Sequence, residues 1–331
     1  MSLSLIPQVY NPKLHLINFL LLFACSSTGL AQGKYCVDEI KEMNLPHLPG
    51  KVHTYYSPGQ ENRATELQSL LQRASKVFED SLKVKVDLVL AALDAKTWGG
   101  LMDKPYGLPT MRTGACKRGG GSFPESRYAA IMPGGIDGPI YTSWIELKDT
   151  LPLSALRKLK AAGIGIEQGG KLLIDFVALH ELGHAYAHKF GLNFYVQFFA
   201  EFMADYLAYA FLRSTDERLD KQIMAVLAAN VETIIPVHSS FNKYEVFRSS
   251  EHPPTETWYN SIITLKAAEI YDQRGFEFLY AVQKEFTEKE GELKTDNIIA
   301  RLEKIHPGIL SWSNNISGSV KKIQTPKTGV H

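Results

Sequence analysis

Residues 180–184 read His-Glu-Leu-Gly-His and lie within an apolar segment that runs from Leu172 to His188. If this segment is a helix, the two motif histidines lie about one turn apart and point the same way. Their Nε2 atoms can then reach one Zn²⁺ ion at roughly 2.0–2.1 Å. Glu181 leans towards the coordination position left open, where a reacting water needs a general base. The motif therefore predicts a metal site suited to hydrolysis.

A pair of acidic residues follows the motif on a second helical segment. Glu201 and Asp205 are four positions apart in a stretch whose other residues are almost all apolar or aromatic. An antiparallel hairpin that turns near residues 192 and 193 places Glu201 opposite His184. The same register places Asp205 opposite His180. Carboxylates in such a surface are costly unless each meets a cation or a donor, and a zinc ion with its bound imidazoles supplies both.

The two motifs together resemble those of the gluzincin branch of the zincin-like metallopeptidases, which combine H-E-x-x-H with a later E-x-x-x-D. The resemblance directly covers only about residues 172–211. It implies a zincin-like fold that binds one Zn²⁺ per chain and hydrolyses a peptide or protein substrate. It also implies site roles: the ligands are His180, His184 and Glu201, the general base is Glu181, and the partner that orients His180 is Asp205.

The related metzincin pattern fits less well. It needs Gly three residues and His six residues after the second motif histidine, where this chain has Ala187 and Phe190. His188 continues the stripe of imidazoles, but in a straight helix its Cα lies about 12 Å from that of His180, too far to share one metal. We interpret His188 as a residue that complements the dipole at the helix C-terminus.

Other interpretations of these residues remain open. The motif histidines could be ordinary helix residues, and the acidic pair could bind Arg213 or Lys189, although the apolar flanks argue against a solvated face. A different class of function is a non-catalytic exported binding or structural protein whose zinc only holds the fold together. Glu181 distinguishes the two classes, because a structural site has no use for a base beside an open position.

Peptide hydrolysis also needs a donor for the developing oxyanion. By position the candidates are His252, in the segment Ser250–Pro254, and Tyr259. A loop histidine and a packing tyrosine are equally compatible with these positions. In the expected mechanism, zinc polarises the scissile carbonyl, while Glu181 takes a proton from water and returns it to the leaving amine.

The first 31 residues have the features of a secretory signal peptide. Lys13 precedes the apolar run 16–24, and small residues up to Ala31 suggest cleavage there, which predicts a secreted or periplasmic protein. The alternative is a lipoprotein, since residues 22–25 resemble a lipoprotein processing site and Cys25 would then carry a lipid anchor. After either cleavage, Cys36 and Cys116 form a candidate disulfide, although nothing in the sequence shows that they meet.

Composition sets further bounds. The 331 residues are 45% hydrophobic, enough for one large domain or two lobes with a full core. The 36 basic and 35 acidic residues create no bulk field, so we predict no nucleic-acid partner. We find no stretch after residue 31 that is long and apolar enough to span a bilayer.

The order of the predicted elements indicates an α+β fold. Residues 32–59 form a loose lead-in, residues 61–82 a helix, residues 83–93 a strand, and residues 105–124 a glycine-rich loop in which Gly119–Gly121 is a weak candidate for phosphate binding. Residues 127–133 form another strand, and within it residues 128–132 are our candidate for an edge strand that pairs with a peptide.

The second half of the chain is predicted to be helical. Helical spacing covers residues 216–234, 256–273, 275–288 and 295–305, and the polar residues 311–331 suggest a flexible tail. The zincin-like domain then spans residues 60–310, with a mixed α/β lobe over about 60–190 and an all-helical lobe over about 191–310. The metal-binding helix stands at their junction, beside a cleft.

Overall fold

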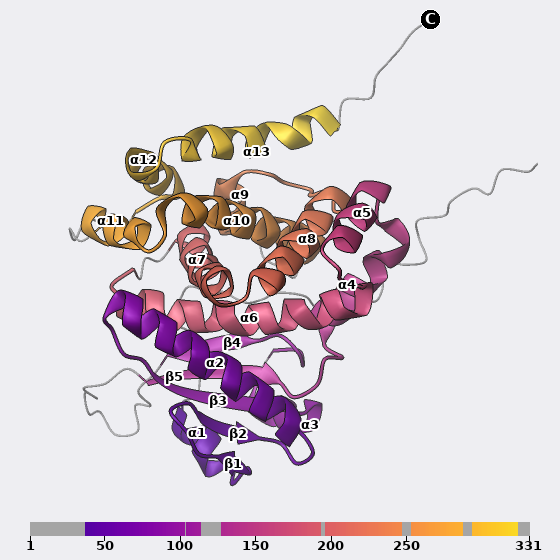
Figure 1. Ribbon diagram of the computed structural model, residues 1–331, viewed down its shortest axis with the longest axis vertical. Helices are drawn as coiled ribbons and strands as arrows, with labels where there is room; N and C mark the ends of the chain where they lie inside the picture. The colour runs from indigo at the N-terminus through magenta and orange to yellow at the C-terminus, as the bar shows by residue number, and fades with distance from the viewer. Residues whose placement is uncertain are drawn as a thin grey trace, which may run out of the picture.

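The computed structural model describes residues 37–102, 104–113, 127–192, 196–246, 253–286 and 293–323. Helices predominate, and one small mixed sheet makes this an α+β fold. Helix α6 (Ile166–Lys189) separates the two parts: the sheet and α2 (Glu61–Leu82) lie on one side of it, and the later helices lie on the other (Figure 1). A mixed α/β part and a helical part are both present, but residues 153–161, which were expected in the α/β lobe, pack on the helical part.

The five strands of the sheet lie in the order β1-β2-β3-β5-β4. Strands β2 (His53–Tyr56), β3 (Asp87–Leu93) and β5 (Arg127–Pro133) are parallel, while β1 (His47–Leu48) and β4 (Thr110–Thr113) add antiparallel edges. Six consecutive residues of β3 are buried, which is typical of a parallel strand covered on both faces. The two strands predicted at residues 83–93 and 127–133 are confirmed, although the first begins at Asp87.

Three sequence-based expectations for this part were wrong. β5 lies between β3 and β4, so it is not an edge strand, and β4 takes that place from within the predicted glycine-rich loop. The expected lead-in instead forms α1 (Val37–Glu42) and strands β1 and β2, because β2 pairs with β3 over four residues. Short strands with mixed polarity leave little periodic signal in the sequence.

Helix α2 covers the sheet with an apolar stripe. Leu67, Leu71, Ala74 and Phe78 recur at helical spacing and are buried, as the sequence predicted. The helix ends where Lys83 adopts a left-handed conformation. Arg63 of α2 binds Asp175 of α6 at 2.6 Å, which ties the helix that covers the sheet to the motif helix.

Helices that the sequence did not predict precede α6. They are α3 (Ala95–Leu101), α4 (Pro139–Glu146), a 3₁₀ turn (Leu147–Thr150) and α5 (Leu153–Ala161). α4 packs on the first turns of α6, where Trp144 donates to the Ile166 carbonyl oxygen at 2.6 Å. Gly169 leaves room for the indole, since a Cβ there would lie 3.0 Å from Trp144 Nε1.

The helical part follows the predicted order, except for a short helix at residues 241–246 that the sequence did not predict. It consists of α7 (Gln197–Thr215), α8 (Glu217–Thr233), α9 (Phe241–Val246), α10 (Pro253–Arg274), α11 (Glu277–Glu285), α12 (Thr295–Ile305) and α13 (Ile309–Ile323). The predicted tail is wrong for its first part, because α13 continues to Ile323. Its Trp312 ring lies 5.1 Å from that of Phe241, centroid to centroid.

Several predictions concern residues outside the described ranges. These are the signal peptide, the lipid anchor at Cys25, the disulfide between Cys36 and Cys116, and the Gly119–Gly121 loop. Within the described ranges, no helix combines the length and the apolar character needed to cross a membrane.

Candidate metal centre

The motif helix and α7 meet at a glycine. A Cβ on Gly183 would lie 2.5 Å from the Ala204 carbonyl oxygen and 2.9 Å from its Cα, so only glycine permits this approach of the two backbones. In Figure 1, α6 runs across the view while α7 is strongly foreshortened. The helices therefore cross, rather than lying side by side as an antiparallel hairpin. The predicted facing pairs nevertheless meet, because they flank the crossing point.

Three side chains converge beside this crossing. Nε2 of His180 lies 3.1 Å from one carboxylate oxygen of Glu201, and Nε2 of His184 lies 3.6 Å from the other. All three ligand atoms lie within 4.8 Å of one another, so this group could hold a metal ion. The two imidazole rings are nearly perpendicular, with centroids 4.6 Å apart.

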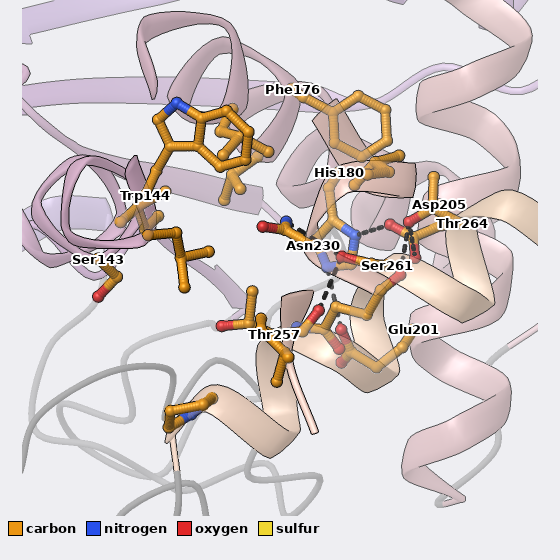
Figure 2. A pocket seen from close by; sticks show the side chains of 18 of the residues that line it. Ser143, Trp144, Phe176, His180, Glu201, Asp205, Asn230, Thr257, Ser261 and Thr264 are labelled. Atoms are coloured by element: carbon orange, nitrogen blue, oxygen red, sulfur yellow. Dashed lines mark hydrogen bonds and ion pairs between the residues drawn. The ribbon is translucent and has the colours of Figure 1, made fainter. Parts of the chain in front are cut away.

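Asp205 contacts the second ring nitrogen of His180, Nδ1. Its Oδ1 lies 2.6 Å from His180 Nδ1, and its Oδ2 accepts a hydrogen bond from Thr264 at 2.8 Å (Figure 2). A proton on Nδ1 directs the Nε2 lone pair towards Glu201 and His184, which is the tautomer that a metal ligand needs. Thr264 comes from α10, and no sequence pattern linked it to the motif.

Burial and the neighbouring charges shift the pKa values at this site in opposite directions. Burial lowers the pKa of His180, but Asp205 and Glu201 more than offset this and raise the pKa well above its ordinary value. Burial lowers the pKa of His184 and raises that of Asp205. Glu201 and Asp205 are each only 2% exposed. Buried carboxylates are stable only when paired, so the site favours a cation.

Two buried polar atoms support that conclusion. Nε2 of His184 and Oε1 of Glu181 are shielded from solvent, and neither has a hydrogen-bond partner among the described residues. Such atoms are rare in folded proteins and often mark the place of an ion or a reacting group. Glu181 is 2% exposed and lines the same cavity as His180 and Glu201.

The cavity beside the metal group is mainly apolar. Helices α4, α6, α8 and α10 contribute most of its walls (Figure 2). Its lining residues are Ile140, Ser143, Trp144, Leu147, Leu173, Phe176, Val177, His180, Glu181, Glu201, Asp205, Leu227, Asn230, Ile234, Pro254, Thr257, Asn260, Ser261 and Thr264. It therefore joins an apolar binding space to a cluster of ionisable groups, a combination typical of active sites.

Of the two predicted oxyanion donors, only Tyr259 can be placed in the structure. His252 lies outside the described residues, and the buried Tyr259 hydroxyl donates to the Ser240 carbonyl oxygen at 3.0 Å. Asn260, which lines the cavity, is a better candidate. Its Oδ1 accepts a hydrogen bond from Tyr244 at 3.0 Å, which leaves its Nδ2 as a donor.

Two other interpretations from the sequence are corrected. Nδ1 of His188 lies 2.6 Å from the Tyr128 hydroxyl, and burial lowers the pKa of His188. This disfavours the charged form that a dipole interaction needs, so His188 serves to link α6 to β5. Arg213 binds Asp272 at 2.9 Å and not the acidic pair of α7.

Comparisons with protein-family models, curated proteins and solved structures gave no match to this chain. The assignment of the site therefore depends on its residues and their geometry. What these establish is a group of two histidines and one glutamate that could hold a metal ion, in which His180 and Glu201 are buried and His184 is half-buried. A further glutamate lines the same cavity.

Proposed function

We propose that this protein is a zinc-dependent metallopeptidase with a gluzincin-like site. The observation that carries the proposal is the convergence of His180, His184 and Glu201, with the buried and unpartnered Oε1 of Glu181 in the same cavity. The first three residues would hold the metal. Glu181 is not one of these ligands, and a purely structural metal site does not need a general base.

The donor set fits zinc. Two imidazoles and one carboxylate leave a coordination position open, as in catalytic zinc sites, whereas Mg²⁺ and Ca²⁺ prefer oxygen ligands alone. When bound, zinc supplies Lewis acidity, which polarises a carbonyl and lowers the pKa of water to about 7. Asp205 keeps His180 in the tautomer that presents its Nε2 lone pair.

The remaining side chains supply proton transfer and charge stabilisation. The Glu181 carboxylate takes a proton from the attacking water and delivers it to the nitrogen of the leaving amine. The Asn260 amide, held by Tyr244, donates to the oxygen on which negative charge develops. The apolar walls exclude bulk water and strengthen these interactions.

The test compares wild type with Glu181→Gln by cleavage of a peptide library, with and without a chelator. The variant should keep its fold and its zinc, because Glu181 is not one of the three proposed ligands. Its hydrolysis should fall by roughly two to four orders of magnitude without the base. Glu167→Gln makes the same chemical change at an exposed position of α6 and should retain full activity.

The outcomes separate the two classes of function. Zinc-dependent cleavage that survives Glu181→Gln undiminished would contradict the proposed mechanism. A folded wild type that binds zinc but cleaves no peptide would favour the non-catalytic alternative, in which the metal holds α6 and α7 together. We also propose that the protein is exported, on the basis of its N-terminal apolar segment.

A further inference from the structure

A buried carboxamide interrupts the apolar wall of the cavity. Asn230 of α8 is 2% exposed and lines the cavity beside the metal group. Its Oδ1 is shielded from solvent and has no hydrogen-bond partner among the described residues. An unsatisfied buried acceptor is energetically costly, so a ligand that supplies a donor gains binding free energy from meeting it.

Its neighbours fix the orientation of this carboxamide. The Ser261 hydroxyl donates its one proton to the Thr257 carbonyl oxygen at 2.8 Å. Ser261 Oγ can therefore only accept from Asn230, and it does so from Nδ2 at 3.2 Å. Rotating the amide would set two acceptors against each other. Figure 2 accordingly shows the Asn230 oxygen on the side that faces Trp144 across the cavity.

The walls around this acceptor favour an aromatic occupant. Trp144 and Phe176 present rings, and Leu173 and Leu227 present aliphatic surface. The Trp144 N–H is already engaged by the Ile166 carbonyl oxygen, so the indole contributes apolar surface. An occupant that matches this cavity has an apolar, planar body and one hydrogen-bond donor near its tip.

We propose that this cavity is a specificity pocket for a tyrosine or tryptophan side chain, and that the Asn230 Oδ1 accepts the hydrogen bond from its phenol or indole donor. Phenylalanine fills the same space but leaves Oδ1 unsatisfied. Lysine would bring a charge against apolar walls, because the carboxylates among the cavity-lining residues, Glu181, Glu201 and Asp205, belong to the metal group. The peptide context of this side chain depends on the proposed peptidase function, whereas the preference for a donor does not.

Binding of small probes to the purified protein tests this preference without catalysis. By calorimetry, p-cresol should bind about tenfold more tightly than toluene, the ratio expected for one net hydrogen bond of about 1.4 kcal/mol. 4-Methylanisole carries the oxygen but no donor, so it should bind no more tightly than toluene. Equal affinities of p-cresol and toluene for wild type would overturn the proposal.

Two variants assign the effect to Asn230. Asn230→Leu removes the acceptor at similar volume and should bring the ratio of p-cresol to toluene affinity close to one. Asn242→Leu makes the same change at an exposed position of α9, outside the cavity, and should keep the wild-type ratio. If Asn230 only ties α8 to α10, Asn230→Leu will lower stability and leave the ratio unchanged, which also overturns the proposal.

Peptide cleavage then separates this proposal from the proposed function. With peptides that differ only in tyrosine, tryptophan or phenylalanine, wild type should prefer the first two, and Asn230→Leu should lose the preference. A probe ratio near ten without any peptide cleavage would leave the pocket proposal standing and remove the peptidase. Zinc-dependent cleavage with no preference over phenylalanine would do the reverse.

Discussion

Glu201 and Asp205 lie one turn apart on α7 and contact the same imidazole from opposite sides. The sequence predicted that Asp205 faces His180 and that Glu201 faces His184, and these pairs lie 2.6 and 3.6 Å apart. It did not predict the shorter contact of Glu201 with His180. It could not predict Thr264, Asn260 or Asn230. These residues reach the cavity from α8 and α10, and nothing local in the sequence fixes how those helices pack on α6.

At the residue scale, the two acids should differ in their effect on zinc binding. Glu201→Ala removes a charged oxygen ligand and should abolish tight zinc binding. Asp205→Asn removes only the group that orients His180, so the affinity should fall by roughly 10–100-fold. Titration against a competing chelator measures both affinities. Wild-type affinity in Glu201→Ala would place the third ligand elsewhere and remove the gluzincin-like assignment.

At the scale of elements, the sequence predicted long helices better than short strands. Helices α2, α8, α10 and α12 were predicted within a few residues, because their apolar positions repeat over several turns. Strand β4 was missed because its four residues lie among glycines and prolines. The place of β5 in the sheet was also missed, since strand order depends on long-range pairing that a single strand does not encode.

At the element scale, the crossing of α6 and α7 predicts the cost of a single methyl group. Gly183→Ala puts a Cβ against the Ala204 backbone, which cannot move aside as a side chain can. We expect a loss of roughly 1–3 kcal/mol in the free energy of unfolding, together with weaker zinc binding. Chemical denaturation and a zinc titration measure the two effects.

The matched control for this prediction is Gly99→Ala. Gly99 is also helical, but a Cβ there meets nothing within 4 Å, so the change should be neutral or slightly stabilising. If both substitutions behave alike, the close approach of the two helices does not limit stability.

At the scale of the whole molecule, the last described helix, α13, packs against the helical part and is not a tail. Residues 311–331 were interpreted as a tail because of their polar composition. However, Ile309, Trp312 and Ile316 are spaced at i, i+3 and i+7, and this pattern of an amphipathic helix was present in the sequence. The buried Ile309 and Ile316, and the contact of Trp312 with Phe241, show that α13 packs on the core.

Neighbouring residues of α13 provide a direct test at this scale. Ile309 is fully buried and Leu310 is 45% exposed. Ile309→Ala should lower the free energy of unfolding by roughly 2–5 kcal/mol, as expected for a large aliphatic residue removed from a core. Leu310→Ala should cost well under half of that. Equal effects in denaturant titrations would mean that α13 is not part of the cooperative unit.

Export is a prediction about the whole chain and is tested at its N-terminus. If residues 1–31 are a signal peptide, the protein recovered from its native host should begin near Gln32. Processing as a lipoprotein should instead leave a lipid-modified Cys25 as the first residue. Mass spectrometry of the intact protein distinguishes the two, and a retained Met1 or Ser2 terminus would exclude both.

The crossing of α6 and α7 has a consequence for the lifetime of the protein. If the site holds zinc as we propose, ligands from both helices bind the ion only in the folded chain. Free zinc would then add about 2.7 kcal/mol to the free energy of unfolding at a hundredfold excess over its dissociation constant. Because α6 also carries the sheet and α2 on its other side, this gain protects both halves of the molecule from unfolding together. Metal scarcity would then act as a degradation signal, since proteases cleave the open population that zinc suppresses.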